Sequence, residues 1–178
     1  MKMNITASLI LGLALSTAYA NDTKPAPAAG PTDPQIASIV VTANTVDIEA
    51  GKLAKSKSTS AEIKKFAQQM ITDHASVNDS ATKLVKKLNV KPEDNSTSKD
   101  LKKGGDENIA KLKTLKGKDF DKAYVDNEVS YHQTVLNAID DTLIPSATNP
   151  ELKALLNQVR PSIAAHLEHA KHIQSTLK

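Results

Sequence analysis

Apolar residues recur along most of this chain at the three- and four-residue spacing of one face of an α-helix. No segment shows the strict alternation of apolar and polar residues, bounded by turn residues, that marks a half-buried β-strand. The pattern therefore predicts an all-α domain. Four long amphipathic helices are expected, over residues 34–56, 60–88, 119–143 and 150–177.

Capping residues support three of these helix starts. Thr59 and Glu62 have the spacing of a capping box at the start of the second helix. The pairs Asp33-Pro34 and Asn149-Pro150 each place a capping residue before a proline, which is favoured at the first helical position. We therefore expect the first helix to be capped by Asp33 and the fourth by Asn149.

The lengths of the links between these helices predict the topology. Only a few residues join the first helix to the second and the third to the fourth, so each of these pairs must be antiparallel. Residues 89–118 separate the second helix from the third, which is enough to cross the length of a bundle. This order of links predicts a ferritin-like four-helix bundle with a long crossover. Within the crossover we expect a short extra helix between Ser98 and Leu115, broken at Gly104-Gly105.

The first 20 residues have the pattern of a secretory signal peptide. Lys2 precedes the apolar run "ITASLILGLALSTA", and "AYA" supplies small residues for cleavage after Ala20. Residues 21–32 are rich in proline and alanine and are expected to form a flexible spacer before a bundle domain at 33–178. The apolar run is short for a membrane span, so we predict a periplasmic or secreted protein without a transmembrane segment in the mature chain.

Composition narrows the classes of function. The chain of 178 residues has no cysteine, which excludes disulfides and a cysteine-linked lipid anchor. It has no tryptophan, 3% aromatic residues and a net charge of +3 without a basic block, which argues against nucleic-acid binding. No nucleophile–base pair or cofactor-binding loop occurs. A binding or structural role is therefore favoured over catalysis.

Five polar residues interrupt the apolar faces of the expected helices when each helix is drawn with 3.6 residues per turn. Each lies within three residues of the middle of its helix, so a bundle in register would bring them into one layer across the core. These residues are Asp47, His74, Glu128, His132 and His166.

Such a layer has two interpretations. Each polar group buried without a partner costs about 1–3 kcal/mol, so the residues must pair with one another, hold water or bind a ligand. Imidazole and carboxylate groups bind zinc, iron, copper and manganese, which predicts one transition-metal ion held by the five residues. The alternative is a hydrogen-bonded network that only sets the register of the helices.

The sequence does not support a di-iron site, and it offers one weaker candidate for a second metal site. A ferritin-type di-iron site needs Glu-x-x-His pairs, and none occurs, since Glu128 and His132 are four residues apart. His166, His169 and His172 form a cluster in sequence, but His172 faces away from the other two. One ion in the central layer is therefore the favoured prediction, with metal handling or protection of the cell envelope from stress as its role.

Four segments resemble the bacterial exported family called domain of unknown function 4142: "DIEAGKLA", "MITDH", "FDKAYVDNEVSYH" and "RPSIAAHL". The resemblance extends over about residues 34–177. It implies a ferritin-like helical fold but no established activity, and members are often labelled outer membrane proteins. All three inward-facing histidines are among the positions that match the family's pattern. The matching positions are Asp47, Asp73, His74, Phe120, Asp121, Tyr124, His132, Pro161, His166 and Leu167.

Overall fold

The computed structural model describes residues 30–177, and every regular element in this range is helical. The predicted signal peptide and residues 21–29 of the predicted spacer lie outside the described residues. The all-α class is confirmed. The elements are α1 (Asp33–Lys57), α2 (Ala61–Lys87), α3 (Ser96–Thr114), α4 (Gly117–Ala138), the π-helical segment η1 (Ile139–Leu143), the short α5 (Ile144–Ser146) and α6 (Pro150–Thr176).

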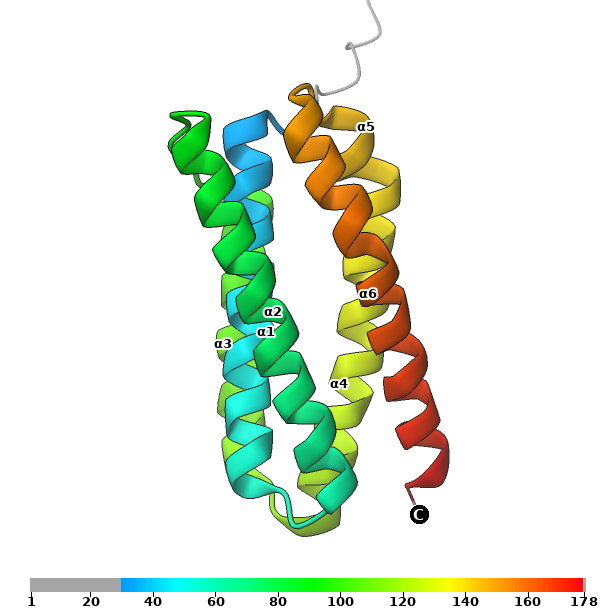
Figure 1. Cartoon of the computed structure of the whole chain (residues 1–178). Helices are drawn as coiled ribbons and strands as arrows, with labels where there is room; N and C mark the ends of the chain where they lie inside the picture. Colours follow the sequence, from blue (N-terminus) through cyan, green and yellow to red (C-terminus); the bar gives the residue numbers. More distant parts are fainter. Residues whose placement is uncertain (1–29, 178) are drawn as a thin grey trace, which may run out of the picture.

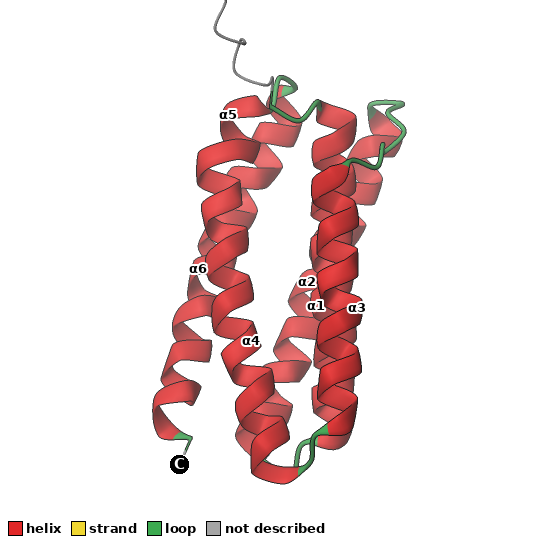
Figure 2. Cartoon of the chain, turned by 180° about the vertical axis from the view of Figure 1, so that it is seen from behind, coloured by secondary structure: helices red, strands yellow, loops and turns green. Residues whose placement is uncertain are grey.

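The helices are arranged side by side along one common axis. In Figure 1, α1 runs downward, α2 returns upward, and α3 runs downward again beside α1. The second side is made of α4, which runs upward, and α6, which runs downward and packs against it. Seen from behind in Figure 2, the same two groups face each other across the core. Because α3 returns along the whole bundle, α2 and α4 run in the same direction.

The segment between α2 and α4 differs from its prediction. We expected a short helix broken at Gly104-Gly105, but α3 is continuous over 19 residues. Gly105 is buried against α1, where an added Cβ would lie 2.7 Å from two side-chain carbons of Val46. The lack of a side chain at Gly105 therefore allows α1 and α3 to pack closely. Tertiary packing of this kind outweighs the weak helix propensity of two glycines.

The two neighbouring glycines are expected to respond to alanine with opposite signs. An added Cβ at Gly104 meets no atom within 4 Å, so Gly104→Ala should raise the free energy of unfolding by up to about 1 kcal/mol through helix propensity. Gly105→Ala gains the same propensity but pushes against the stiff, branched side chain of Val46, so it should lower that free energy. Urea denaturation measures both. Equal stabilisation by the two variants would contradict close α1–α3 packing at Gly105.

Two helix starts are displaced by one residue from their predicted positions. α1 is capped by Thr32 and not by Asp33, and α2 is capped by Ser60 and not by Thr59. Asn149 caps α6 as predicted. Each displaced cap has a neighbour of similar chemistry, so the sequence pattern alone does not choose between them.

Two apolar clusters fill the interior of the bundle, one on each side of a polar layer. The lower cluster in Figure 1 includes Phe66 and Tyr124, and the upper cluster includes Ile36 and Leu156. Within residues 30–177, no helix combines the length and the hydropathy that a membrane span requires. The polar layer between the two clusters is where the chemistry of the molecule is concentrated.

Candidate metal centre

The five polar residues predicted from the helical pattern meet in the interior of the bundle. α1 supplies Asp47, α2 supplies His74, α4 supplies Glu128 and His132, and α6 supplies His166. Each is at most 3% exposed to solvent. Four helices therefore each direct at least one metal-binding side chain into a layer that excludes bulk water.

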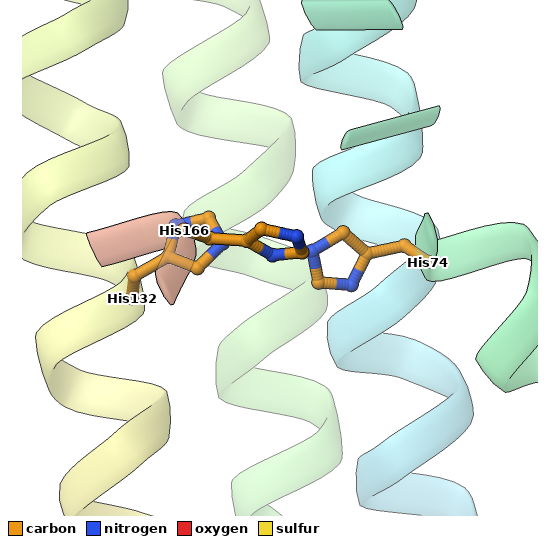
Figure 3. A group of neighbouring side chains, drawn as sticks. All are labelled: His74, His132 and His166. Atoms are coloured by element: carbon orange, nitrogen blue, oxygen red, sulfur yellow. The ribbon is translucent and has the colours of Figure 1, made fainter. Parts of the chain in front are cut away.

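The three histidine rings form a nearly equilateral triangle. Their centroids are 5.3 Å apart for His74 and His166, 5.4 Å for His132 and His166, and 5.6 Å for His74 and His132. One ring nitrogen of each lies within 4.8 Å of the other two. Figure 3 shows the rings meeting from three different helices. With metal–nitrogen bonds of about 2.1 Å, nitrogens in a tetrahedral shell are about 3.4 Å apart, so small ring movements suffice to bind one ion.

The hydrogen bonds of Asn44 decide which nitrogen of His74 carries the hydrogen. The amide nitrogen of Asn44 donates to the Val40 carbonyl at 2.8 Å, so its Oδ1 faces His74 Nδ1 at 2.7 Å. Because Oδ1 only accepts, His74 Nδ1 must be the donor. The neutral ring then carries its lone pair on Nε2, which lies buried in the layer.

The other two histidines follow the same rule. His132 Nδ1 lies 3.0 Å from the Glu128 backbone carbonyl, which accepts its hydrogen and leaves the lone pair on Nε2. His166 Nε2 lies 2.9 Å from Asp73 Oδ2, which accepts its hydrogen and leaves the lone pair on Nδ1. His132 Nε2 and His166 Nδ1 are both buried without a hydrogen-bond partner.

All three rings therefore have one nitrogen bonded to the protein and one lone-pair nitrogen in the layer. Metal-binding histidines in proteins nearly always donate their second ring hydrogen to a carboxylate or a carbonyl, which fixes the ring and its tautomer. Here the three acceptors are an amide, a backbone carbonyl and a carboxylate. The arrangement supplies three oriented nitrogen ligands for one cation.

Asp47 brings a carboxylate to the same point. Its Oδ2 lies 2.5 Å from His74 Nε2 and 3.5 Å from His132 Nε2, yet none of these atoms has a hydrogen bond of acceptable geometry. Burial raises the pKa of Asp47, but positive charge on the nearby His74 and His132 rings, when they are protonated, outweighs burial and lowers the pKa below its usual value. Asp47 is therefore anionic. The buried carboxylate needs positive charge beside it, and either a proton on a neighbouring ring or a metal cation supplies that charge.

Glu128 is the fifth residue of the layer, and its protonation state differs from that of Asp47. Both of its carboxyl oxygens are buried without a hydrogen-bond partner, and Oε2 lies 3.4 Å from His132 Nδ1. Burial, and then the charge of Asp47, raises the pKa of Glu128 well above its usual value, which favours the neutral acid. A nearby metal cation would reverse this preference, because positive charge lowers the pKa of a carboxyl group. Glu128, Asp47 and His132 also place one ligand atom each within 4.8 Å of one another.

A surface groove leads to the layer between α2 and α6. It has a volume of about 200 Å³, and both His74 and His166 lie in its wall. Polar side chains line much of the rest, including Asp73, Ser76 and Ser162. Asp73 is 42% exposed at its side chain while it bonds to buried His166. The groove therefore gives a hydrated ion a polar route to the histidines.

Sequence reasoning gave Asn44 and Asp73 no part in binding. Asn44 lies three residues before Asp47 in α1, a spacing that places the two side chains on one face of a helix. The helical pattern places Asp73 at the edge of the apolar face of its helix, so it was not predicted to be a ligand. Residue spacing can suggest which side chains hold the histidines in place. Only the hydrogen bonds between different helices identify them.

The weaker histidine cluster of α6 does not assemble. His169 packs edge-on against Phe66, with ring centroids 5.0 Å apart, and His172 is exposed. Among residues 30–177, the groups whose ligand atoms lie close enough for one ion include neither of them. His166 belongs instead to the central layer with residues from other helices.

Comparisons with known proteins give one match. A family model described as "Domain of unknown function (DUF4142)" matches residues 18–173. Searches of curated proteins and of solved structures gave no match. The family description names no ligand, so the interpretation of the site depends on its own geometry.

Proposed function

Since this chain belongs to the family described as a domain of unknown function (DUF4142), whose name states no activity, we propose from the site itself that the protein binds one transition-metal ion. The ligands are His74, His132 and His166, with Asp47 as the fourth. A bound cation would favour the ionised form of Glu128. The Glu128 carboxylate would then bind the metal ion as a further ligand or accept a hydrogen bond from a water bound to the ion.

One observation carries this proposal. Three buried lone-pair nitrogens, on three helices, have tautomers set by Asn44, by a backbone carbonyl and by Asp73. A network that only set the register of the helices would pair the nitrogens of His132 and His166 with donors, because an unpaired buried acceptor costs about 1–3 kcal/mol. Within the described residues, His132 Nε2 and His166 Nδ1 lack a hydrogen-bond partner, and His74 Nε2 faces Asp47 Oδ2 at 2.5 Å, where a proton or a metal ion would lie between the two atoms.

The ligand set indicates a class of ion. Three neutral imidazoles and one carboxylate suit divalent zinc, copper, iron or manganese, whereas calcium and magnesium prefer oxygen ligands. A bound ion would supply a Lewis acid or, for iron, copper and manganese, a redox centre. The groove beside His74 and His166 supports access to one face of the ion. Binding and storage need no further residues, so we place metal binding ahead of catalysis.

The helix order supports a ferritin-like topology for this domain. The antiparallel pairs α1–α2 and α4–α6 are joined through α3, and ferritin-like bundles also carry their metal ligands on facing helices. The signal-peptide pattern at residues 1–20 supports export to the periplasm. In that compartment the protein would serve metal handling or protection of the envelope from stress.

Metal stoichiometry tests the proposal directly. Untagged protein beginning at Asn21 is dialysed against zinc, copper, iron(II) or manganese, and bound metal is counted by mass spectrometry. We expect one ion per chain for at least one metal, and binding weakened at least a hundredfold in His132→Ala. His172→Ala is the matched control, because His172 is exposed on α6 outside the layer, and it should bind like the parent.

The same measurement judges the structural alternative. If no metal binds to the parent at micromolar concentration, the proposal is wrong and the layer only orders the helices. Equal loss in His132→Ala and His172→Ala would assign binding to surface histidines. The proposal requires that His132→Ala loses metal binding and that His172→Ala retains it.

A further inference from the structure

A second cavity lies next to the histidine layer, among residues of the apolar cluster that includes Ile36 and Leu156. It has a volume of about 190 Å³ and is enclosed by α1, α4, η1 and α6, with the first turns of α3 at its rim. The proposed metal site uses no side chain of its apolar wall. A cavity of this size is unusual, since protein interiors are packed as densely as organic crystals.

The lining of this cavity is almost entirely apolar. Its deep wall consists of buried aliphatic side chains such as Ile39, Ile139 and Leu156, and none of its lining residues between 30 and 177 is charged. Three exposed threonines, Thr97, Thr134 and Thr142, lie at the rim. Small-molecule sites have this composition: a concave apolar wall with a few polar groups at the opening.

Two further features connect the cavity to function. One wall is the π-helical segment η1, and such segments occur frequently at functional sites because they displace side chains from α-helical register. The floor contains Asn44, which orients His74, and Ile163, one turn before His166 on α6. A molecule in the cavity would therefore contact the residues that support the histidine layer.

We infer that this cavity is a binding site for a small uncharged apolar molecule, of the size of one aromatic ring or a short alkyl chain. An apolar cavity of about 150 Å³ in another protein stays dry and binds benzene, so a volume of this order suffices. The threonine rim accommodates one hydroxyl group at the opening. A carboxylate is disfavoured, because no cationic side chain in the described part of the chain lines the cavity to replace the water around the carboxylate.

Binding is tested on metal-free protein, so that the result does not depend on the proposed metal site. Isoleucine methyl groups are labelled with ¹³C, and the protein is titrated with benzene, n-hexanol and hexanoate. We expect saturable shifts of the Ile39, Ile139 and Ile163 methyl groups with benzene and hexanol, at dissociation constants below about 1 mM. Hexanoate should bind at least tenfold more weakly than hexanol.

A pair of matched variants identifies the site. Ala138→Leu places additional carbon atoms in the cavity and should abolish the shifts, whereas Ala154→Leu makes the same change at an exposed position of α6 and should retain them. Ala43→Val, which adds less volume to the same cavity, replaces Ala138→Leu if that variant does not fold. Absence of saturable shifts in the parent, or equal binding by the filled and control variants, would overturn the assignment.

Discussion

Adding zinc to chelator-treated protein, at one hundred times its dissociation constant, is expected to raise the midpoint of thermal unfolding by about 10 °C. A ligand that binds only the folded chain stabilises it by RT ln(1 + [L]/Kd), which is about 2.7 kcal/mol at this concentration. For a domain of this size, each 1 kcal/mol raises the midpoint by about 4 °C. The unfolded chain cannot hold His74, His132 and His166 together, so it does not share this gain.

Variants of the layer separate metal binding from a structural network. His74→Ala, His132→Ala and His166→Ala should each abolish the increase with zinc. His132→Ala also removes a buried ring and leaves a cavity, so its midpoint should fall with or without zinc. Differential scanning calorimetry with zinc, and separately with excess chelator, measures both effects.

His172→Ala serves as the control, because it removes an imidazole from the exposed face of α6. It should keep the full increase with zinc. If zinc shifts the parent and all three layer variants equally, the ion binds elsewhere and the proposed ligand set is wrong. A parent that does not respond to zinc, copper, iron or manganese would contradict metal binding itself.

In the metal-free protein, His132 is expected to contribute a loss of about 3 kcal/mol of stability between pH 6.5 and pH 4. Burial is the main reason, since it lowers the pKa of His132 from 6.5 to about 4 although Asp47 acts in the opposite direction. Below pH 6.5 the unfolded chain takes up a proton at His132 that the folded protein does not accept until about pH 4. The unfolded state is therefore stabilised relative to the folded state as the pH falls through this window.

The neighbours of His132 modify the size of this effect. Burial also lowers the pKa of His166, so His166 adds to the loss of stability in acid. The raised pKa of Glu128 acts oppositely, because its folded acid form is favoured as the pH falls. The pKa of Asp47 lies below its usual value, so Asp47 contributes only at a lower pH. Because Glu128 opposes the two histidines, the contribution of His132 is measured as the difference between the parent and a variant that lacks this imidazole.

Urea denaturation from pH 7.5 to pH 4.5, with chelator present, measures this dependence. His132→Leu cannot take up the proton, so the slope of the free energy of unfolding against pH should decrease by up to about 1.4 kcal/mol per pH unit. His172→Leu should keep the slope of the parent. The comparison uses slopes, so a uniformly less stable variant remains informative. An unchanged slope in His132→Leu would show that buried His132 does not resist protonation.

Local sequence pattern was sufficient for the helical class and for the identity of the polar layer. Helix periodicity is a property of each segment alone, and it placed His74, His132 and His166 on apolar faces near the middle of their helices. The exported state predicted from residues 1–20 stays a prediction, since those residues lie outside the described range. The crossover helix was expected to break at two glycines because local propensity contains no information about Val46 on α1.

Tertiary structure alone decided how the layer is connected. The lone-pair nitrogens depend on acceptors such as Asn44 and Asp73, and the rotamers and tilts that bring them to the rings arise only when the helices pack. The same holds for the apolar cavity, whose walls come from five separate elements. A sequence pattern records which face of a helix is buried, whereas distances of a few ångströms between helices follow from the packing of the whole core.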